Sequence, residues 1–366
     1  MFPPYPILLM VRALDAGGTE RQLAELAMSL DRSRFYPHVG CFRPGGMRWQ
    51  ELQSAGVPLF HIPVTSFRAP STLLAVAMLG GYLRERRIQL VHTFDPPANL
   101  FGVPAARLLR IPVVLSSQRS FRSLRSAGSR RLLRLTDTIA DGIVVNCRAV
   151  KSSLIEEEKV PAGRIHLCHN GIDPNRFHAR RPARDADCPL VIAYLGVVRP
   201  EKSLGTLLEA FQQLTPADRT LQLRIVGSGP SAAALAQQAL ALGLGARCSF
   251  HPFTNQVDDV LREVDIFVLP SVSEALSNSL MEAMACGCAV VASRVGGNPE
   301  LVTHGETGLL FEPGDSADLA AGLRLLIADD SLRQHLGRNA AERINLHFSL
   351  RDSAAEMAGI YERYLA

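Results

Sequence analysis

Short apolar runs alternate along the whole chain with longer segments in which apolar residues recur at helical spacing. Residues 19–30, for example, carry apolar side chains at positions 23, 26, 27 and 30, which share one face of a helix. In the first half of the chain the runs that predict strands are Ile7–Val11, His38–Phe42, Leu90–Thr93, Val113–Ser116 and Gly142–Asn146. Strands that alternate with helices in this way predict parallel sheets built from β-α-β units.

A second series of the same kind begins near residue 190, after a polar, arginine-rich stretch over residues 176–189 that we interpret as a linker. Its predicted strands are Val191–Leu195, Leu221–Val226, Cys248–His251, Ile266–Pro270, Ala289–Ala292 and Leu309–Phe311. Its predicted helices are Leu204–Phe211, Ala232–Leu242, Gln256–Val264 and Asn278–Ala285, and a last helical segment spans residues 349–365.

These patterns predict an α/β protein with two Rossmann-like, doubly wound parallel-sheet domains that face a cleft. The expected domains are residues 1–180 and 181–348, and residues 349–366 are expected to form a helix that packs back on the first domain. Doubly wound domains bind ligands outside the carboxyl ends of their strands, so the predicted site lies in that cleft.

Charge is divided unevenly between the two halves of the chain. Residues 1–183 hold 25 Lys and Arg against 13 Asp and Glu, whereas residues 184–366 hold 14 against 22. A basic first half predicts an anionic partner. Because no recognised nucleic-acid-binding motif is present, we do not expect nucleic acid; an anionic membrane surface or a lipid phosphate fits the charge.

The cysteines and the apolar segments bear on the compartment. None of the seven cysteines belongs to a CxxC pair or to a His/Cys cluster with zinc spacing, so we expect reduced thiols, a cytoplasmic protein and no metal site. Ile7–Leu14 is interpreted as a buried first strand and not as a signal peptide, because no basic segment precedes it and Asp15 follows it. Leu73–Leu83 is apolar but too short to span a bilayer, so we expect no transmembrane helix.

The densest group of chemically useful side chains lies in residues 273–287, after the predicted strand Ile266–Pro270. Glu274 and Glu282 stand eight positions apart there, and an ionised carboxylate accepts hydrogen bonds from several hydroxyl groups. Ser277 or Asn278 can cap the following helix, so we expect the N–H groups of residues 278–281 to face the cleft and receive a diphosphate. Glu282 also has a structural alternative, because Ser279 and Glu282 form an S-x-x-E capping box.

The spacing E-x7-E followed by A-M-A-x-G resembles the family-4 retaining glycosyltransferases, which have the GT-B fold. Six further segments resemble motifs of that family, in the expected order along nearly the whole chain. They are Gly17-Gly18-Thr19-Glu20, Asn170-Gly171-Ile172-Asp173 with Phe177, Arg199-Pro200-Glu201-Lys202, Val226-Gly227-Ser228-Gly229-Pro230, Val295-Gly296-Gly297-Asn298-Pro299-Glu300 and Gly305-Glu306-Thr307-Gly308.

The resemblance implies a role for each matching residue. Glu282 would bind the ribose hydroxyls of the donor and Glu274 the transferred sugar, near the reacting centre. Lys202 and Arg199 would neutralise the diphosphate, and since fixed cations and a helix start stabilise its developing charge, no metal or other cofactor is expected. The rest of the implied donor-binding set is Gly17, Gly18, Gly227, Ser228, Gly229, Ser277, Asn278, Ser279 and Leu280.

We therefore expect a metal-independent, retaining glycosyltransferase that moves a sugar from a UDP- or GDP-sugar to a glycan or lipid-linked acceptor of cell-envelope polysaccharide or glycolipid synthesis. Two departures from the family pattern keep alternatives open. Val197 stands where an Arg often follows the strand glycine, and Ala275-Leu276-Ser277 replaces G-F-G. The alternatives are a nucleotide-sugar epimerase of the same fold and a non-catalytic nucleotide-sugar-binding subunit; locally, Arg199 and Lys202 could be surface charges and the 227–229 loop a tight turn.

Four residues are candidate contacts in the first domain: His92, Gln118, Arg119 and Asn170. Gln118 or Arg119 would take the place of a His that the family commonly has after the corresponding strand, and His92 could equally be a satisfied core histidine. The arginines from Arg119 to Arg134 are interleaved with leucines, a pattern that suits an anionic membrane surface as well as a solvated face. We expect the protein to attach peripherally to the inner face of the plasma membrane.

Overall fold

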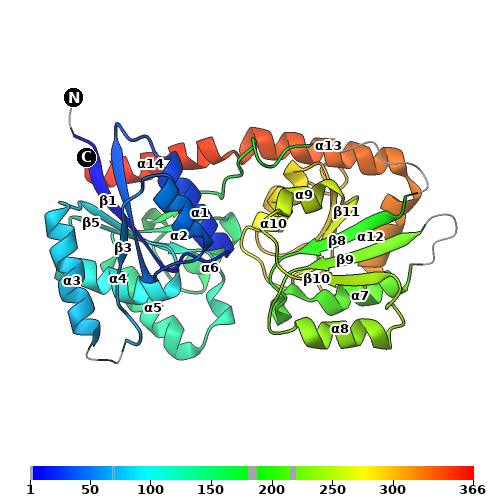
Figure 1. The fold of residues 1–366 in the computed structure, drawn as a ribbon, viewed down its shortest axis with the longest axis horizontal. Coiled ribbons are helices and arrows are strands. Elements are labelled where there is room, and N and C mark those ends of the chain that lie inside the picture. The colour runs from blue at the N-terminus through cyan, green and yellow to red at the C-terminus, as the bar shows by residue number, and fades with distance from the viewer. Residues whose placement is uncertain (1–2, 68, 70, 180–187, 215–219) are drawn as a thin grey trace. The chain divides into compact units, whose positions relative to one another are not determined.

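The computed structural model describes residues 3–67, 69, 71–179, 188–214 and 220–366. The chain forms two compact units (Figure 1): unit 1 comprises residues 1–171 and 350–366, and unit 2 comprises residues 172–349. Residues 180–187, in the middle of the stretch interpreted as a linker, lie outside the described residues.

Unit 1 is built on a seven-stranded parallel sheet with the order β3-β2-β1-β4-β5-β6-β7. Its strands are β1 (Tyr5–Ala13), β2 (Phe35–Arg43), β3 (Leu59–His61), β4 (Leu90–Thr93), β5 (Val113–Gln118), β6 (Gly142–Val145) and β7 (Ile165–Leu167). Its helices are α1 (Gly18–Ser29), α2 (Met47–Ser54), α3 (Ser71–Glu85), α4 (Pro96–Leu108), α5 (Ala127–Ile139), α6 (Arg148–Glu156) and α14 (Leu350–Leu365), with 3-10 turns η1 (Arg122–Leu124) and η2 (Ala162–Arg164).

The alternation of side chains along β1 divides the core of unit 1 into two layers. Ile7 and Leu9 belong to a cluster with α1, α2 and α14, whereas Leu8 and Met10 belong to a second cluster with α3 and α4. All four side chains are fully buried, as a parallel strand covered by helices on both faces requires.

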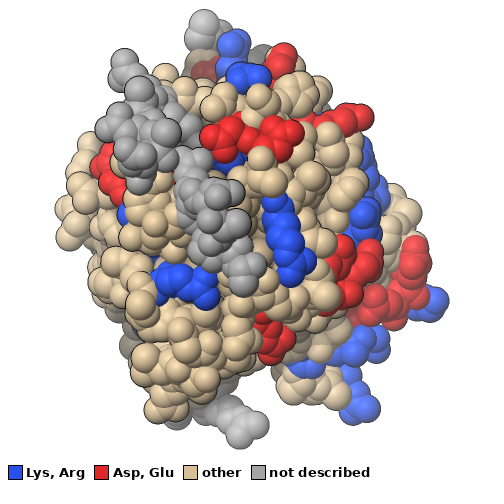
Figure 2. Space-filling view, turned by 90° about the vertical axis from the view of Figure 1, so that its right-hand side faces the viewer, with Lys and Arg blue, Asp and Glu red and all other residues tan. Residues whose placement is uncertain are grey.

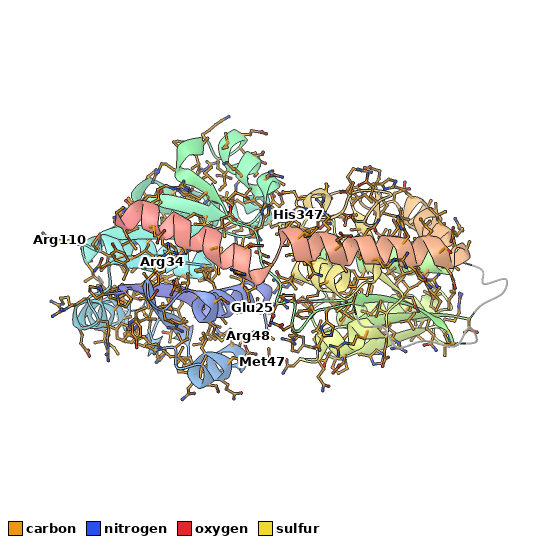
Figure 3. The ribbon with its side chains drawn as sticks, turned by 90° about the horizontal axis from the view of Figure 1, so that it is seen from above. Glu25, Arg34, Met47, Arg48, Arg110 and His347 are labelled. Atoms are coloured by element: carbon orange, nitrogen blue, oxygen red, sulfur yellow. The ribbon has the colours of Figure 1, made fainter. Side chains whose placement is uncertain are left out.

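The C-terminal helix α14 is an integral part of unit 1. It packs beside α1, and its Tyr361 is fully buried in the first core cluster. Arg34, which is labelled in Figure 3 beside α14, donates a hydrogen bond to the carboxylate of Glu362. The last segment of the chain therefore completes the core of the unit in which the chain begins.

Unit 2 is built on a six-stranded parallel sheet with the order β10-β9-β8-β11-β12-β13. Its strands are β8 (Leu190–Leu195), β9 (Leu221–Val226), β10 (Cys248–His251), β11 (Ile266–Leu269), β12 (Ala289–Ser293) and β13 (Leu309–Phe311). Its helices are α7 (Leu204–Gln212), α8 (Ala232–Ala241), α9 (Val257–Arg262), α10 (Asn278–Ala285), α11 (Asn298–Leu301), α12 (Ser316–Ala328) and α13 (Asp330–His347), with the 3-10 turn η3 (Pro200–Lys202).

The prediction of two doubly wound parallel-sheet units is confirmed, and each strand predicted from an apolar run is present. The elements that were not predicted are the short strands β3 and β7 and the helices α2 to α6, α11, α12 and α13. Within the described part of the chain, no helix is both long enough and apolar enough to cross a bilayer.

Candidate active site

The topology of unit 2 places two loops at its switch point. The sheet grows from β8 toward β9 and β10 on one side and toward β11, β12 and β13 on the other. The loops that leave the carboxyl ends of β8 and β11 therefore start beside each other and diverge, at the position where doubly wound sheets bind their ligands. The β8 loop runs through Gly196 to Lys202, and the β11 loop runs from Ser271 into α10.

An ion pair joins these two loops. The ammonium group of Lys202 donates a hydrogen bond to Oε2 of Glu274, and the hydroxyl of Ser271 donates to the same oxygen over 3.2 Å. The side chains of Lys202 and Glu274 are 19% and 14% exposed, so solvent screens the pair less than it screens a surface pair. The backbone N–H of Val272 also donates to the carbonyl of Glu201, at 2.9 Å. Lys202 and Glu274, predicted from separate motifs, are therefore in direct contact.

Arg199 is placed differently from Lys202. Its side chain is 57% exposed, and its guanidinium lies 3.9 Å from the carboxylate of Glu201. The side chain of Val197 is also exposed, while its carbonyl accepts a hydrogen bond of 3.0 Å from the buried phenol of Tyr194. Burial raises the pKa of Tyr194, and the carboxylates of Glu274 and Glu201 raise it further. Of the two predicted cations, only Lys202 is held at the switch point.

Gly227 and Gly229, in the loop after β9, are required by the packing of the backbone itself. A Cβ on Gly227 would lie 1.9 Å from the carbonyl oxygen of Gly196, and one on Gly229 would lie 2.1 Å from that of Val198. The N–H of Val198 donates to the carbonyl of Ser228 at 3.0 Å. The loops after β8 and β9 thus touch backbone to backbone, which requires glycine at both positions.

Helix α10 begins after Ser277, one of the two caps predicted for it. Fewer of its first backbone N–H groups are free to bind a ligand than the prediction assumed. Ser277 is the N-cap, and its side-chain oxygen accepts from the N–H of Leu280 at 3.3 Å. The N–H of Met281 bonds to the carbonyl of Ser277 at 3.1 Å. The expectation that all four N–H groups of residues 278–281 face a ligand is therefore wrong for Leu280 and Met281. Because the cap is Ser277, the alternative capping box between Ser279 and Glu282 does not start this helix.

The segment around Glu274 is buried and braced. Ala275 and Leu276, which stand where the family has glycine and phenylalanine, are both buried, and Glu282 is buried in the second turn of α10. The carbonyl of Ala275 accepts from the N–H of Gly297 at 2.8 Å. On the strand side, the hydroxyl of Ser293 donates to the carbonyl of Ser271 at 2.5 Å. These hydrogen bonds were not predicted from the sequence, because Ser293 and Gly297 reach the β11 loop only through the order of the strands in the sheet.

Unit 1 has its own switch point, between β1 and β4. Asp95, in the turn between β4 and α4, caps α4 by accepting from the N–H of Ala98 at 2.8 Å, and its second oxygen accepts from the N–H of Arg12 at 2.9 Å. Gly17 is the N-cap of α1, and a Cβ on it would lie 2.1 Å from a carboxylate oxygen of Glu20. Gly18 is the first residue of that helix. The pKa values of Asp95 and Glu20 are both raised, chiefly by burial.

Of the four candidate contacts in unit 1, His92 is part of the core. Its ring is fully buried, with Nδ1 2.8 Å from the hydroxyl of Tyr361 and Nε2 2.8 Å from that of Ser117. Burial lowers the pKa of His92 to about 3, and the charge of Arg119 acts in the same direction. A neutral ring with both nitrogens occupied favours the core alternative for this residue.

The other three candidates meet at the end of β5. The guanidinium of Arg119 donates to the side-chain oxygen of Asn170, which is buried. Gln118 is buried as well; its amide donates to the carbonyl of Ser120 at 2.5 Å and accepts from Nε of Arg122 at 3.2 Å. Arg119 is therefore the candidate whose charged end stands at the carboxyl edge of the sheet.

Comparison with known proteins agrees with the motifs. Residues 16–176 match the family described as Glycosyltransferase Family 4, and residues 176–343 match Glycosyl transferases group 1. The D-inositol 3-phosphate glycosyltransferase of Corynebacterium efficiens is 32% identical over 80% of this chain and 76% of its own length. Sulfoquinovosyl transferase SQD2 of Arabidopsis thaliana is 29% identical over 69% of this chain, and the match spans about half of that protein, 52%. The crystal structure of Anabaena HepE in complex with UDP and glucose has a TM-score of 0.86 at 22% identity, over 97% of this chain and 99% of HepE, a likeness in fold.

Proposed function

This chain belongs to the GT-B glycosyltransferases described as group 1 and Family 4, and from that premise we propose that it moves a sugar from a UDP- or GDP-sugar to a glycan or lipid-linked acceptor. The proposed product class is cell-envelope polysaccharide or glycolipid. The names of two relatives refer to an inositol phosphate and a sulfoquinovosyl group, and HepE was crystallised with UDP and glucose. The HepE complex favours a UDP-sugar donor, and the names of the two relatives leave the sugar open.

The observation that carries the proposal is the contact between Lys202 and Glu274 across the switch point of unit 2. A donor whose diphosphate approaches Lys202 would take over that cation and leave the carboxylate of Glu274 to accept hydrogen bonds from sugar hydroxyls. Glu282, in the second turn of α10, is proposed to bind the ribose. Arg199, with its exposed side chain, is proposed to swing onto the diphosphate when the donor binds.

We propose that transfer proceeds with retention at the anomeric carbon. The bond between that carbon and the diphosphate oxygen breaks, the bond to the acceptor oxygen forms on the same face, and the acceptor proton passes to the departing phosphate. Lys202 and the start of α10 would stabilise the negative charge that develops on the diphosphate. In this scheme the residues that we assign hold the donor and its leaving group, and none of them is required as a base.

Peripheral attachment to an anionic membrane is part of the proposal, although the run from Arg119 to Arg134 is less basic at the surface than expected. Arg122 is buried, with 2.7 Å between its Nη1 and Oδ2 of Asp137, and Arg130 and Arg134 both donate to Glu158. In the described part of unit 1 these pairs neutralise much of the run. Figure 2 looks onto the side of Figure 1 on which α12 and β9 of unit 2 lie, and the Lys and Arg drawn there are interspersed with Asp and Glu.

Exposed apolar side chains on unit 1 support the attachment better than charge does. Leu73 and Leu74 on α3 are 77% and 60% exposed, and arginines follow at the end of that helix. Leu132 and Leu135 on α5 are also exposed. A helix that carries both exposed leucines and arginines suits the headgroup region of an anionic bilayer. In liposome flotation we expect binding to phosphatidylglycerol vesicles that weakens in Leu73→Glu/Leu74→Glu; equal flotation of both proteins would exclude α3 as the contact.

Two alternatives are separated by one product analysis. Purified protein is incubated with UDP-glucose, UDP-galactose or GDP-mannose, with and without a mixture of glycan and lipid acceptors, and the products are identified by mass spectrometry and NMR. Transfer that needs an acceptor and yields an α-linked product from an α-linked donor supports the proposal. Interconversion of the donors without acceptor would indicate an epimerase, and tight binding without turnover would indicate a non-catalytic subunit. Repeating the assay in EDTA tests the proposed independence from metal.

A further inference from the structure

A pocket in unit 1 lies along the edge strand β7. Its volume is about 410 Å³, and residues of α6, β7 and α14 line it. The lining residues that bear on its chemistry are Lys151, His166, Leu167, Glu356, Gly359 and Arg363. Among the described residues that line it, none is assigned above to the donor or to its leaving group. A volume near the lower end of the range for ligand pockets suits a small molecule.

Two cations from different helices line this pocket. Lys151 belongs to α6 and Arg363 to α14. In the described part of the chain, neither side chain forms an ion pair or a hydrogen bond. Burial lowers the pKa of His166, and the charges of Arg363 and Lys151 lower it further, so its ring is mostly neutral at pH 7. Two cations without a carboxylate partner make the pocket receptive to an anion with two negative charges.

The same pocket offers acceptors for hydroxyl groups. The hydroxyl of Tyr364 donates to the carbonyl of Asp141 at 3.3 Å. Nε2 of His166 lies 2.7 Å from that hydroxyl and therefore donates to it, which leaves Nδ1 of the neutral ring as an acceptor. Glu356 contributes a carboxylate to the lining, and a carboxylate accepts hydrogen bonds from several hydroxyl groups.

Strand β7 adds a backbone donor because it ends the sheet. Among the described residues it pairs only with β6. The N–H of Cys168 donates to the carbonyl of Val145, in β6, at 2.9 Å. The N–H of Leu167, one residue earlier, therefore points to the open side of the strand. Since Leu167 lines the pocket, this N–H can donate to a bound oxyanion.

The missing side chain of Gly359 keeps the pocket open. Gly359 lies inside α14 and is exposed, and a Cβ added to it would meet no other described atom within 4 Å. Glycine destabilises the interior of a helix, and no close approach of another group requires it here. The free space above this residue is part of the pocket that it lines.

We propose that this pocket binds a small, soluble phosphate ester that carries hydroxyl groups and has the size of a hexose phosphate. Lys151, Arg363 and the N–H of Leu167 would hold the phosphate, and Glu356 and His166 would accept from the hydroxyls. A phosphate in a membrane fits less well, because α14 packs in the first core cluster and α3, with its exposed leucines, in the second, on the opposite face of the sheet. Such a ligand site is separate from the proposed glycosyl transfer and does not depend on it.

Isothermal titration calorimetry with glucose 6-phosphate, in the presence of UDP, measures this binding without turnover. We expect saturable binding of glucose 6-phosphate and none of glucose, its uncharged counterpart. Lys151→Met and Arg363→Met should each raise the dissociation constant about tenfold or more, because each removes a charged partner of the phosphate. Arg351→Met, which removes an exposed arginine of α14 that does not line the pocket, is the matched control and should bind like the wild type.

A second variant fills the pocket without removing a charge. Gly359→Leu places a side chain in free space and replaces glycine with a better helix former. Trp49, the single tryptophan, belongs to unit 1 and packs on its first core cluster, so its fluorescence reports the unfolding of that unit. We expect Gly359→Leu to unfold at the same urea concentration as the wild type or a higher one, and to lose glucose 6-phosphate binding. Gly81→Leu, at an exposed glycine of α3 with equally free space, should keep it.

The outcomes distinguish this pocket from other sites. Equal dissociation constants for the wild type, Gly359→Leu and Arg363→Met would overturn the proposal, as would the absence of saturable binding at millimolar glucose 6-phosphate. Binding that is lost in Lys202→Ala and kept in Gly359→Leu would overturn it as well, because the ligand would then lie at the switch point of unit 2. Flotation on phosphatidylglycerol vesicles that Gly359→Leu removes, without glucose 6-phosphate binding, would identify a lipid headgroup and exclude the soluble ester. None of these measurements requires transfer, so a failure of the proposed function would leave them unchanged.

Discussion

Replacing His92 with glutamine is expected to remove part of the acid sensitivity of unit 1. The ring of His92 is fully buried, and its two nitrogens lie 2.8 Å from the hydroxyls of Tyr361 and Ser117. Burial and, to a smaller extent, the charge of Arg119 lower the pKa of this ring to about 3, whereas its ordinary value is 6.5. A glutamine can replace the hydrogen bonds but does not titrate. The variant therefore isolates the effect that protonation of His92 has on the stability of unit 1.

The sign and size of the effect follow from the two pKa values. Because the pKa of His92 is lower in the folded state, the unfolded chain takes up a proton first, and stability falls as the pH drops from 6.5 toward 3. One pKa unit corresponds to about 1.4 kcal/mol, so this histidine removes about 2 kcal/mol of stability between pH 7 and pH 5. His38, whose pKa is lowered to about 4 mainly by burial, adds a comparable loss that the variant retains.

The assay is urea unfolding followed by the fluorescence of Trp49 at pH 7, 6 and 5. We expect His92→Gln to be less stable than the wild type at pH 7, and to lose about 2 kcal/mol less between pH 7 and pH 5. His251→Gln, in unit 2, is the matched control and should leave the Trp49 transition unchanged. Parallel stability curves for wild type and His92→Gln would refute the reasoning. If His92→Gln changed the KM of a substrate and left the pH dependence of the unfolding free energy as in the wild type, the ring of His92 would instead contact a ligand.

Three further predictions concern the site and its support. Lys202→Ala is expected to lower kcat about 10²- to 10³-fold in single-turnover assays, because a fixed cation is lost from the leaving group, whereas Arg199→Ala should cost about tenfold or less; equal losses would mean that exposure does not distinguish the two cations. Glu282→Gln is expected to weaken UDP binding about tenfold in titration calorimetry with little change in kcat, since a charge-assisted hydrogen bond to the ribose is lost; unchanged affinity would contradict the ribose assignment. Arg122→Met is expected to destabilise unit 1 by about 3–5 kcal/mol in the Trp49 assay, because Asp137 and Glu158 are left without it. The double variant Arg122→Met/Asp137→Leu should recover part of that stability, and no recovery would show that packing and not charge causes the loss.

The strands could be predicted from sequence because parallel strands covered on both faces are continuous apolar runs. Leu221–Val226 and Leu309–Phe311 match β9 and β13 residue for residue. The strands β3 and β7 were missed because each is a three-residue edge strand that contains a histidine and is only partly buried, so it forms no apolar run; β13 is as short and also lies at an edge, but its Leu-Leu-Phe sequence is wholly apolar and buried. Helix α13 was missed because its buried apolar side chains are few and stand one turn apart among charged residues.

The shared position of two functional residues could be expected from the resemblance to the family. Lys202 and Glu274 are 72 positions apart in the chain, and the structure accounts for their contact because each follows a strand, β8 or β11, and these strands are neighbours at a switch point. The cap at Ser277 was predictable only as one of two choices, because the sequence does not show which side-chain oxygen reaches the N–H of Leu280.

The electrostatic surroundings of a residue were not predictable in the same way, because they depend on which side chains of other elements fold over it. The arginines from Arg119 to Arg134 form one pattern in the sequence, yet Arg122 is buried against Asp137, and Arg134 is bonded to Glu158 in the segment that follows α6. Once these pairs are removed, Arg119, Arg125 and the exposed Arg131 remain without a carboxylate partner among the described residues. A basic run therefore predicts an anionic partner only through the arginines that the fold leaves without carboxylates, and the sequence alone does not show which arginines those are.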